Sequence, residues 1–143
     1  MSNSALILEY SVINSIALAF LTLVIHAPVL MWRARTKYAW DLSYGTSLVV
    51  AFKANGISFL VSILILSIMI SGGNAVDEAN SLAGLVGILS WWLVHSNAIF
   101  SKANGDPTFT VKNARYFSLT IFGWNFLALI SISLIIVFVG SIA

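Results

Sequence analysis

The sequence contains no cysteine, only two prolines and very few charged residues. Without cysteine it can form neither disulfides nor thiolate metal sites, and it has no cysteine nucleophile. Charged residues make up 8% of the 143 residues, whereas hydrophobic residues make up 59%. So few charged side chains cannot cover a water-soluble globule of this length. The composition therefore predicts an integral membrane protein that lies in a lipid bilayer.

Four apolar segments are long enough to be transmembrane helices, each of which needs about 20 mostly apolar residues to cross the hydrocarbon core. They are residues 5–31, 48–71, 82–100 and 114–139. The first is expected to be a retained helix and not a signal peptide, because no Lys or Arg precedes it and Glu9 lies within it. We therefore predict an all-α fold, a four-helix membrane bundle that forms a single transmembrane domain over residues 1–143.

The basic residues predict how the chain is oriented in its membrane. All seven fall toward the same ends of the helices: Arg33, Arg35, Lys37, Lys53, Lys102, Lys112 and Arg115. The connection between the second and third helices carries only Asp77 and Glu78. Since Lys and Arg concentrate on the cytoplasmic side, we expect loops 33–47 and 101–113 in the cytoplasm and both termini outside, with the chain in the plasma membrane. The net charge of +2 then needs no nucleic-acid partner.

A few polar residues interrupt the predicted helices. Lys53 lies close enough to the inner end of the second helix for its side chain to snorkel to the surface. Asn55 and Asn125 lie deeper, and we expect them to pair between helices, with a ligand contact as the alternative. Small residues that allow close helix packing are Gly56, Ser58, Ala83, Gly84 and Gly87.

Aromatic residues gather near the predicted inner face, where amphipathic rings prefer to lie. We expect Trp32, Tyr38, Trp40, Tyr44, Trp91, Trp92 and Tyr116 to act as interfacial anchors. Pro28, near the end of the first helix, predicts a mild kink.

His26 and His95 have matching predicted depths, since each lies seven residues from its nearest inner-loop cation. Their side chains could therefore meet. Two imidazoles make an incomplete metal site, because Glu9 is expected at the outer interface and Asp41 in a loop. We predict no bound metal and no cofactor, and we expect each histidine to bond to a backbone carbonyl or to a Ser or Asn side chain.

Four stretches of the sequence are VLMWRARTKYAWD, AFKANGISF, SWWLVHSNAIFSK and NARYFSLTIFGWNFLAL. They combine a basic first loop, a polar entry to the second helix, a His-containing third helix and an Arg-led aromatic fourth helix. Together they resemble the MAPEG family, the membrane-associated proteins of eicosanoid and glutathione metabolism, over nearly the whole chain. The resemblance implies a four-helix membrane fold, a homotrimer and a thiol cofactor bound by a polar motif in the second helix.

That motif is approximately Arg, then Asn four residues later, then Glu three residues beyond. Setting its Asn on Asn55 places Ala51 at the Arg position and Ser58 at the Glu position. Glutathione carboxylates favour Arg, and its amine favours a carboxylate, so both complementary groups are missing here. The remaining candidates for contact with a ligand or a lipid headgroup are Arg33, Arg35, Lys53, Asn55, His95, Arg115 and Tyr116. We predict no catalytic residue.

Three functions are compatible with these features. The leading one is a non-catalytic accessory subunit of a larger membrane complex, such as a multi-subunit membrane oxidoreductase, because no paired carboxylates, nucleophile elbow or glycine-rich phosphate loop are present in the sequence. The second is a MAPEG-like homotrimeric glutathione or thiol transferase, or a lipid-metabolising enzyme, with its site between subunits at the inner face. The third is a small transporter or channel, for which more charged or broken-helix features are expected at mid-membrane.

The predicted orientation can be tested with single cysteines, because the natural chain has none. We expect Ser2→Cys to react with a membrane-impermeant thiol reagent from outside the cell and Ser43→Cys to react only after the membrane is opened. Labelling of both positions from outside would contradict the four-span orientation.

Overall fold

The computed structural model describes residues 12, 15–103, 106 and 108–142, and every regular element within them is helical. Four helices are long and apolar enough to cross a membrane: Ser15–Tyr38, Tyr44–Ser71, Val76–Lys102 and Val111–Ile132. The predicted all-α fold with four spans is thereby confirmed, and the chain is a multi-pass membrane protein. The predicted start of the first helix at residue 5, and Glu9, lie outside the described residues.

The helices extend beyond most of the predicted bounds. The first span consists of α-helical residues 15–20, the π-helix η1 (Leu21–His26) and α2 (Ala27–Tyr38), and is followed by α3 (Tyr44–Ser71), α4 (Val76–Lys102) and α5 (Val111–Ile142). The predicted bounds of the first loop, 33–47, are therefore wrong, since only residues 39–43 connect α2 and α3. Hydropathy marks the part of a helix within hydrocarbon, whereas these helices continue into the headgroup region, where charged side chains are hydrated.

A π-helical turn precedes Pro28 in the first span. The Ala27 N–H bonds to the Thr22 carbonyl, and Pro28 has no N–H, so the Leu23 carbonyl loses its usual helical partner. The Tyr44 hydroxyl donates a hydrogen bond to this carbonyl at 2.8 Å. The helix thus passes through its proline without leaving the freed carbonyl unpaired, and the π turn directs Thr22, Ile25 and His26 into the bundle.

The turn between α2 and α3 is fixed by local bonds. Ala39 ends α2 in a left-handed conformation, with φ of 53°, and its N–H bonds to the Ala34 and Arg35 carbonyls. Arg35 and Asp41 form an exposed ion pair at 2.8 Å across the turn. Ser43 then caps α3, since its hydroxyl oxygen accepts a hydrogen bond from the Thr46 N–H at 3.1 Å.

The contact between α3 and α4 is the most extensive one between the described helices. Ser58 Oγ donates to the Gly87 carbonyl at 2.7 Å, and Ser62 Oγ donates to the Ala83 carbonyl at 3.0 Å. A Cβ at Gly87 would overlap Ser62 Oγ. The predicted close packing at Ser58, Ala83 and Gly87 is therefore confirmed.

Two other glycines that the sequence suggested for close packing are not needed for it. At Gly56 and at Gly84, nothing lies within 4 Å of the place a Cβ would take. These residues lie on helix faces that no neighbouring helix approaches. The distinction depends on how each helix is rotated, which the composition of the segment does not reveal.

An aromatic cluster closes the end of the bundle where α2 turns into α3. The rings of Tyr38 and Trp40 stack with centroids 4.8 Å apart, and both contact Phe109 and Phe117 edge-on. Phe117 is fully buried and Phe109 nearly so. Tyr38 and Trp40, which were predicted to be interfacial anchors, thus help to form the core that joins α2 to α5.

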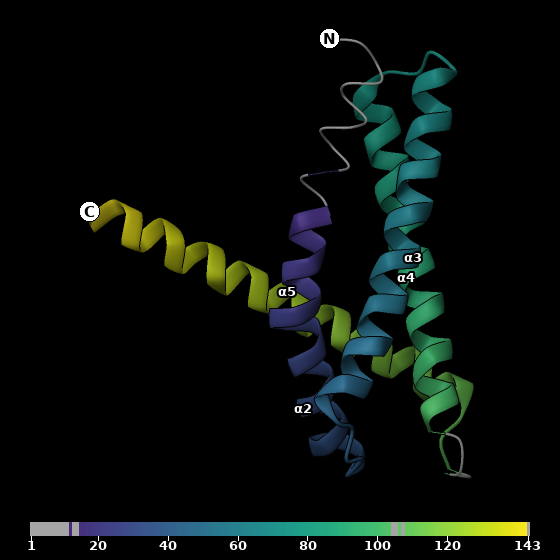
Figure 1. The fold of residues 1–143 in the computed structure, drawn as a ribbon, viewed down its shortest axis with the longest axis vertical. Coiled ribbons are helices and arrows are strands. Elements are labelled where there is room, and N and C mark those ends of the chain that lie inside the picture. Colours follow the sequence, from purple (N-terminus) through teal and green to yellow (C-terminus); the bar gives the residue numbers. More distant parts are fainter. Residues whose placement is uncertain (1–11, 13–14, 104–105, 107, 143) are drawn as a thin grey trace.

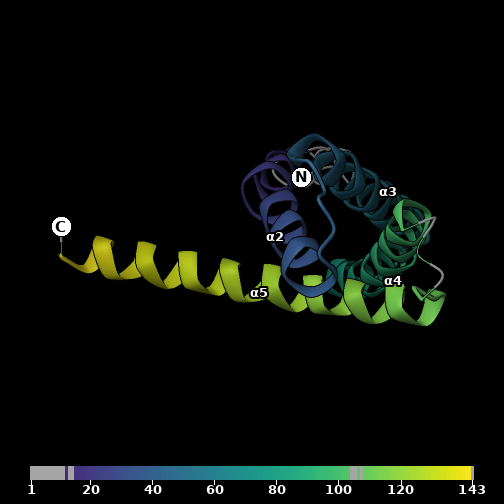
Figure 2. The same cartoon turned by 90° about the horizontal axis from the view of Figure 1, so that it is seen from below.

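The helix α5 follows a different direction from the other three spans. Figure 1 shows the first span, α3 and α4 running side by side, while α5 crosses them obliquely and continues away from them. Seen from below, the three aligned spans surround a common centre and α5 passes along one side (Figure 2). The large side chains of Leu134, Ile135 and Val137 are accordingly exposed. The C-terminal half of α5 forms an arm that extends beyond the bundle.

The role assigned to Gly87 can be tested against Gly84 on the same helix. We expect Gly87→Leu to lower the melting temperature of the detergent-solubilised protein substantially, because the new side chain must push α3 and α4 apart and break the bonds from Ser58 and Ser62. Gly84→Leu should leave the melting temperature unchanged or raise it, because Leu is a better helix former than Gly. Equal effects of the two substitutions would contradict the observed rotation of α4.

Candidate functional site

Asn55 connects three spans in the middle of the bundle. Its Nδ2 donates to Thr22 Oγ1 and its Oδ1 accepts from Trp91 Nε1, both at 2.7 Å. Thr22 Oγ1 in turn donates to the Leu18 carbonyl at 2.7 Å. The predicted interhelical pairing of Asn55 is therefore confirmed, and it joins the first span, α3 and α4 through a single amide.

His26 and His95 meet beside this network, as their matching depths suggested. Their ring centroids lie 5.0 Å apart, and both side chains are fully buried. Trp91 stacks on His95 with centroids 4.7 Å apart and planes inclined by 11°, and it also contacts His26. Trp91, whose indole N–H bonds to Asn55, thus contacts both imidazole rings.

The two histidines differ in their hydrogen bonding. His95 Nδ1 lies 2.7 Å from Ser118 Oγ, so the expected serine partner is present for this residue. Among the residues that the structure describes, His95 Nε2 and both ring nitrogens of His26 have no hydrogen-bond partner, although Asn55 lies next to His26. Within the described residues no third His, Asp, Glu or Cys completes a metal-binding group around this pair. The histidines alone offer only two of the four ligands that zinc usually takes.

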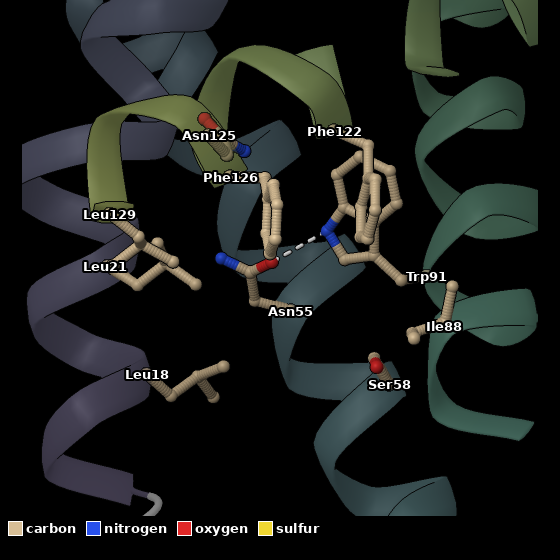
Figure 3. A pocket seen from close by; sticks show the side chains of 10 residues that line it. All are labelled: Leu18, Leu21, Asn55, Ser58, Ile88, Trp91, Phe122, Asn125, Phe126 and Leu129. Atoms are coloured by element: carbon tan, nitrogen blue, oxygen red, sulfur yellow. Dashed lines mark hydrogen bonds between the residues drawn. The ribbon is translucent and has the colours of Figure 1, made fainter. Parts of the chain in front are cut away.

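A pocket of about 380 Å³ adjoins Asn55 and Trp91. Figure 3 shows it between the first span on one side and α4 on the other, with α5 crossing it. Its lining consists of Leu18, Leu21, Asn55, Ser58, Ile88, Trp91, Phe122, Asn125, Phe126 and Leu129. Ile88 and Phe126 are each about half exposed, at 49% and 57%. The pocket therefore opens on the membrane-facing surface of the bundle.

The cationic candidates from the sequence do not line this pocket, and they lie in separate places. The guanidinium of Arg33 lies over the rings of Trp32 and Trp124, at 5.3 and 5.7 Å from the centroids. Arg35 pairs with Asp41. Lys53 is exposed, and it lies nine residues into α3, which places it about 14 Å from the start of the helix.

Arg115 and Tyr116 line a separate groove of about 290 Å³ at the start of α5, together with Trp92, Lys112 and Leu119. Arg115 lies over the Trp92 ring at 5.8 Å, and Trp92 Nε1 donates to the Arg115 carbonyl at 3.2 Å. Two cations beside an aromatic ring suit an anionic lipid headgroup at the interface. The seven candidate residues thus divide among several places, and only Asn55 and His95 belong to the central cluster.

Several residues of this cluster were missed or misassigned from the sequence. Trp91 was expected at the interface, but it is only 6% exposed and lies in the core. Its position four residues before His95 places both on one helix face, which is a signal that the sequence did contain. Thr22 and Ser118 carried no such signal, because isolated hydroxyl residues are common in membrane helices and often bond to their own backbone.

No protein-family model, curated protein or solved structure matches this chain. The resemblance to the MAPEG family stays a prediction.

The role of Asn55 can be measured by substitution. Asn55→Leu removes two interhelical hydrogen bonds and leaves the Trp91 N–H without an acceptor, so we expect a loss of roughly 0.5–2 kcal/mol of stability. Unfolding in a denaturing detergent, followed by circular dichroism, measures this loss. Asn80→Leu is the matched control, because Asn80 Oδ1 has no hydrogen-bond partner among the described residues. An unchanged stability of Asn55→Leu would contradict the structural role of the amide.

Proposed function

We propose that this chain is a non-catalytic subunit of a larger membrane assembly and that it contacts its partner through α5. The observation that carries this proposal is the course of α5, which leaves the other three spans and extends beyond the bundle (Figures 1 and 2). A transmembrane helix gains van der Waals energy by lying along its neighbours. Leu134, Ile135 and Val137 in the second half of α5 are exposed, so these side chains do not gain this energy from the other described spans, and the helices of a partner would supply it.

The length and composition of α5 favour an apolar partner within the membrane. The helix has 32 residues and is therefore about 48 Å long, well beyond the roughly 30 Å thickness of the hydrocarbon core. No charged residue follows Arg115. A helix of this kind suits a partner that presents transmembrane helices with uncharged faces, and not a soluble protein.

The distribution of the cations supports a non-catalytic role. A thiol transferase must hold an anionic cofactor and stabilise its thiolate in one donor-rich pocket. Here the Arg33 guanidinium lies over two indole rings, and Arg35 forms an ion pair with Asp41. Arg115 lies in a separate groove at the start of α5. We therefore expect no saturable binding of glutathione at millimolar concentration in calorimetric titrations.

The proposal predicts that other membrane proteins purify with this chain. Membranes from cells that express a tagged copy of the chain are solubilised in digitonin. The purified material is analysed by size-exclusion chromatography and by mass spectrometry. We expect different membrane chains in a fixed ratio to the tagged one. Recovery of the tagged chain as a monomer would contradict the proposal, and a homotrimer that binds glutathione would favour the MAPEG-like transferase instead.

A matched pair of variants separates a packed interface from a lipid-facing one. Val137 on α5 and Leu85 on α4 are 69% and 63% exposed. Val137→Trp and Leu85→Trp both add apolar bulk, which fluid lipid accommodates but a packed protein interface does not. We expect Val137→Trp to reduce recovery of the partner chains by several-fold and Leu85→Trp to leave it unchanged.

A further inference from the structure

Asn125 is the one side chain on the wall of the described pocket whose buried oxygen has no hydrogen-bond partner within the described part of the chain. The residue is 7% exposed, and its Oδ1 is buried without a partner. The other amide in the wall, Asn55, already uses its oxygen and its nitrogen for Trp91 and Thr22. A buried amide oxygen that has no partner within the described residues, in a side chain that lines a pocket, leaves a hydrogen bond that a ligand can supply.

The rest of the wall limits the kind of ligand. No lining residue is charged, so the pocket suits an uncharged molecule. Three aromatic rings, those of Trp91, Phe122 and Phe126, contribute to the wall, and Trp91 and Phe122 contact each other with centroids 5.6 Å apart. Their flat faces favour a planar ring (Figure 3). A volume of about 380 Å³ lies at the lower end of the range for small-molecule sites and can hold one substituted ring.

A second cavity continues from the first along the membrane-facing side. It has a volume of about 290 Å³ and shares Leu18, Leu21, Ser58 and Leu129 with the first cavity. Its remaining wall includes Ala17, Phe59 and Ser62. A predominantly apolar channel of this kind fits a hydrocarbon chain attached to the ring.

We propose that the two cavities bind one lipid-soluble ring compound that bears carbonyl or hydroxyl groups and a hydrocarbon tail, which is the chemistry of an isoprenoid quinone or quinol. The ring lies against Trp91 and Phe126, and one of its oxygens bonds to Asn125. A hydroxyl donates to the amide oxygen, or a carbonyl accepts from the amide nitrogen. The tail follows Leu18 and Leu21 into the second cavity. The ligand enters from the bilayer, because Phe126 and Ile88 are partly exposed.

Two probes that share a decyl tail, one on a quinone ring and one on a plain benzene ring, test this proposal. The purified chain is titrated calorimetrically with decylubiquinone and with decylbenzene at a fixed detergent concentration. We expect saturable binding of decylubiquinone at one site per chain and binding of decylbenzene weaker by about tenfold or more, because it cannot bond to Asn125. Equal affinity for the two probes would show that the pocket binds apolar molecules without recognising the ring oxygens, and it would overturn the proposal. The absence of saturable binding of both probes would also overturn it.

Substitutions of pocket residues then test whether the probes bind in this pocket. Asn125→Leu should weaken decylubiquinone binding by about tenfold and leave decylbenzene binding unchanged, whereas Asn80→Leu, which lies outside the pocket, should change neither. Leu129→Trp keeps Asn125 but fills the space that the two cavities share, and it should abolish binding of both probes. The melting temperature of each variant reports its folding. Unchanged decylubiquinone affinity in a folded Asn125→Leu or Leu129→Trp variant would overturn the assignment.

Discussion

The interior of a membrane offers no water to a polar group, and this constraint determines how the helices of this chain meet. Lipid tails are as apolar as leucine side chains, so apolar contact alone does not select one helix arrangement over another. The polar contacts do. The Asn55 amide joins three spans, and the hydroxyls of Ser58 and Ser62 attach α3 to backbone carbonyls of α4. Tyr44 serves the same purpose where Pro28 frees a carbonyl.

The same constraint explains why the packing is uneven. Between α3 and α4, small residues allow the two backbones to approach until hydroxyls reach across. Within the described part of the chain, the buried polar contact of α5 is that of Ser118 with His95, while the Asn125 side-chain oxygen has no partner there. With few bonds to align it, α5 crosses the bundle instead of lying along it. Its oblique course leaves the pocket beneath it and directs its second half toward other molecules in the membrane.

The sequence predicted the parts of the structure that depend on composition and length. Four spans, the all-α fold and the buried pairing of Asn55 followed from it, because an amide deep in a membrane helix has few alternatives to a neighbouring helix. Features that depend on helix rotation did not follow. Gly84 and Gly87 look equivalent in the sequence, yet only Gly87 faces α3. Trp91 is buried in the core whereas Trp92 is only partly buried, and the direction of α5 depends on contacts that lie far apart in the chain.

The central claim is that the outer half of α5 lies against another protein within the membrane. Photo-crosslinking in native membranes tests it directly, with a benzophenone amino acid placed at Ile135 on α5 or at Leu60 on α3, which are 61% and 65% exposed. The account predicts a protein adduct containing a different membrane chain at Ile135 and lipid adducts alone at Leu60. Lipid adducts alone at both positions, or a crosslink from Ile135 back to α3 or α4 of the same chain, would contradict it.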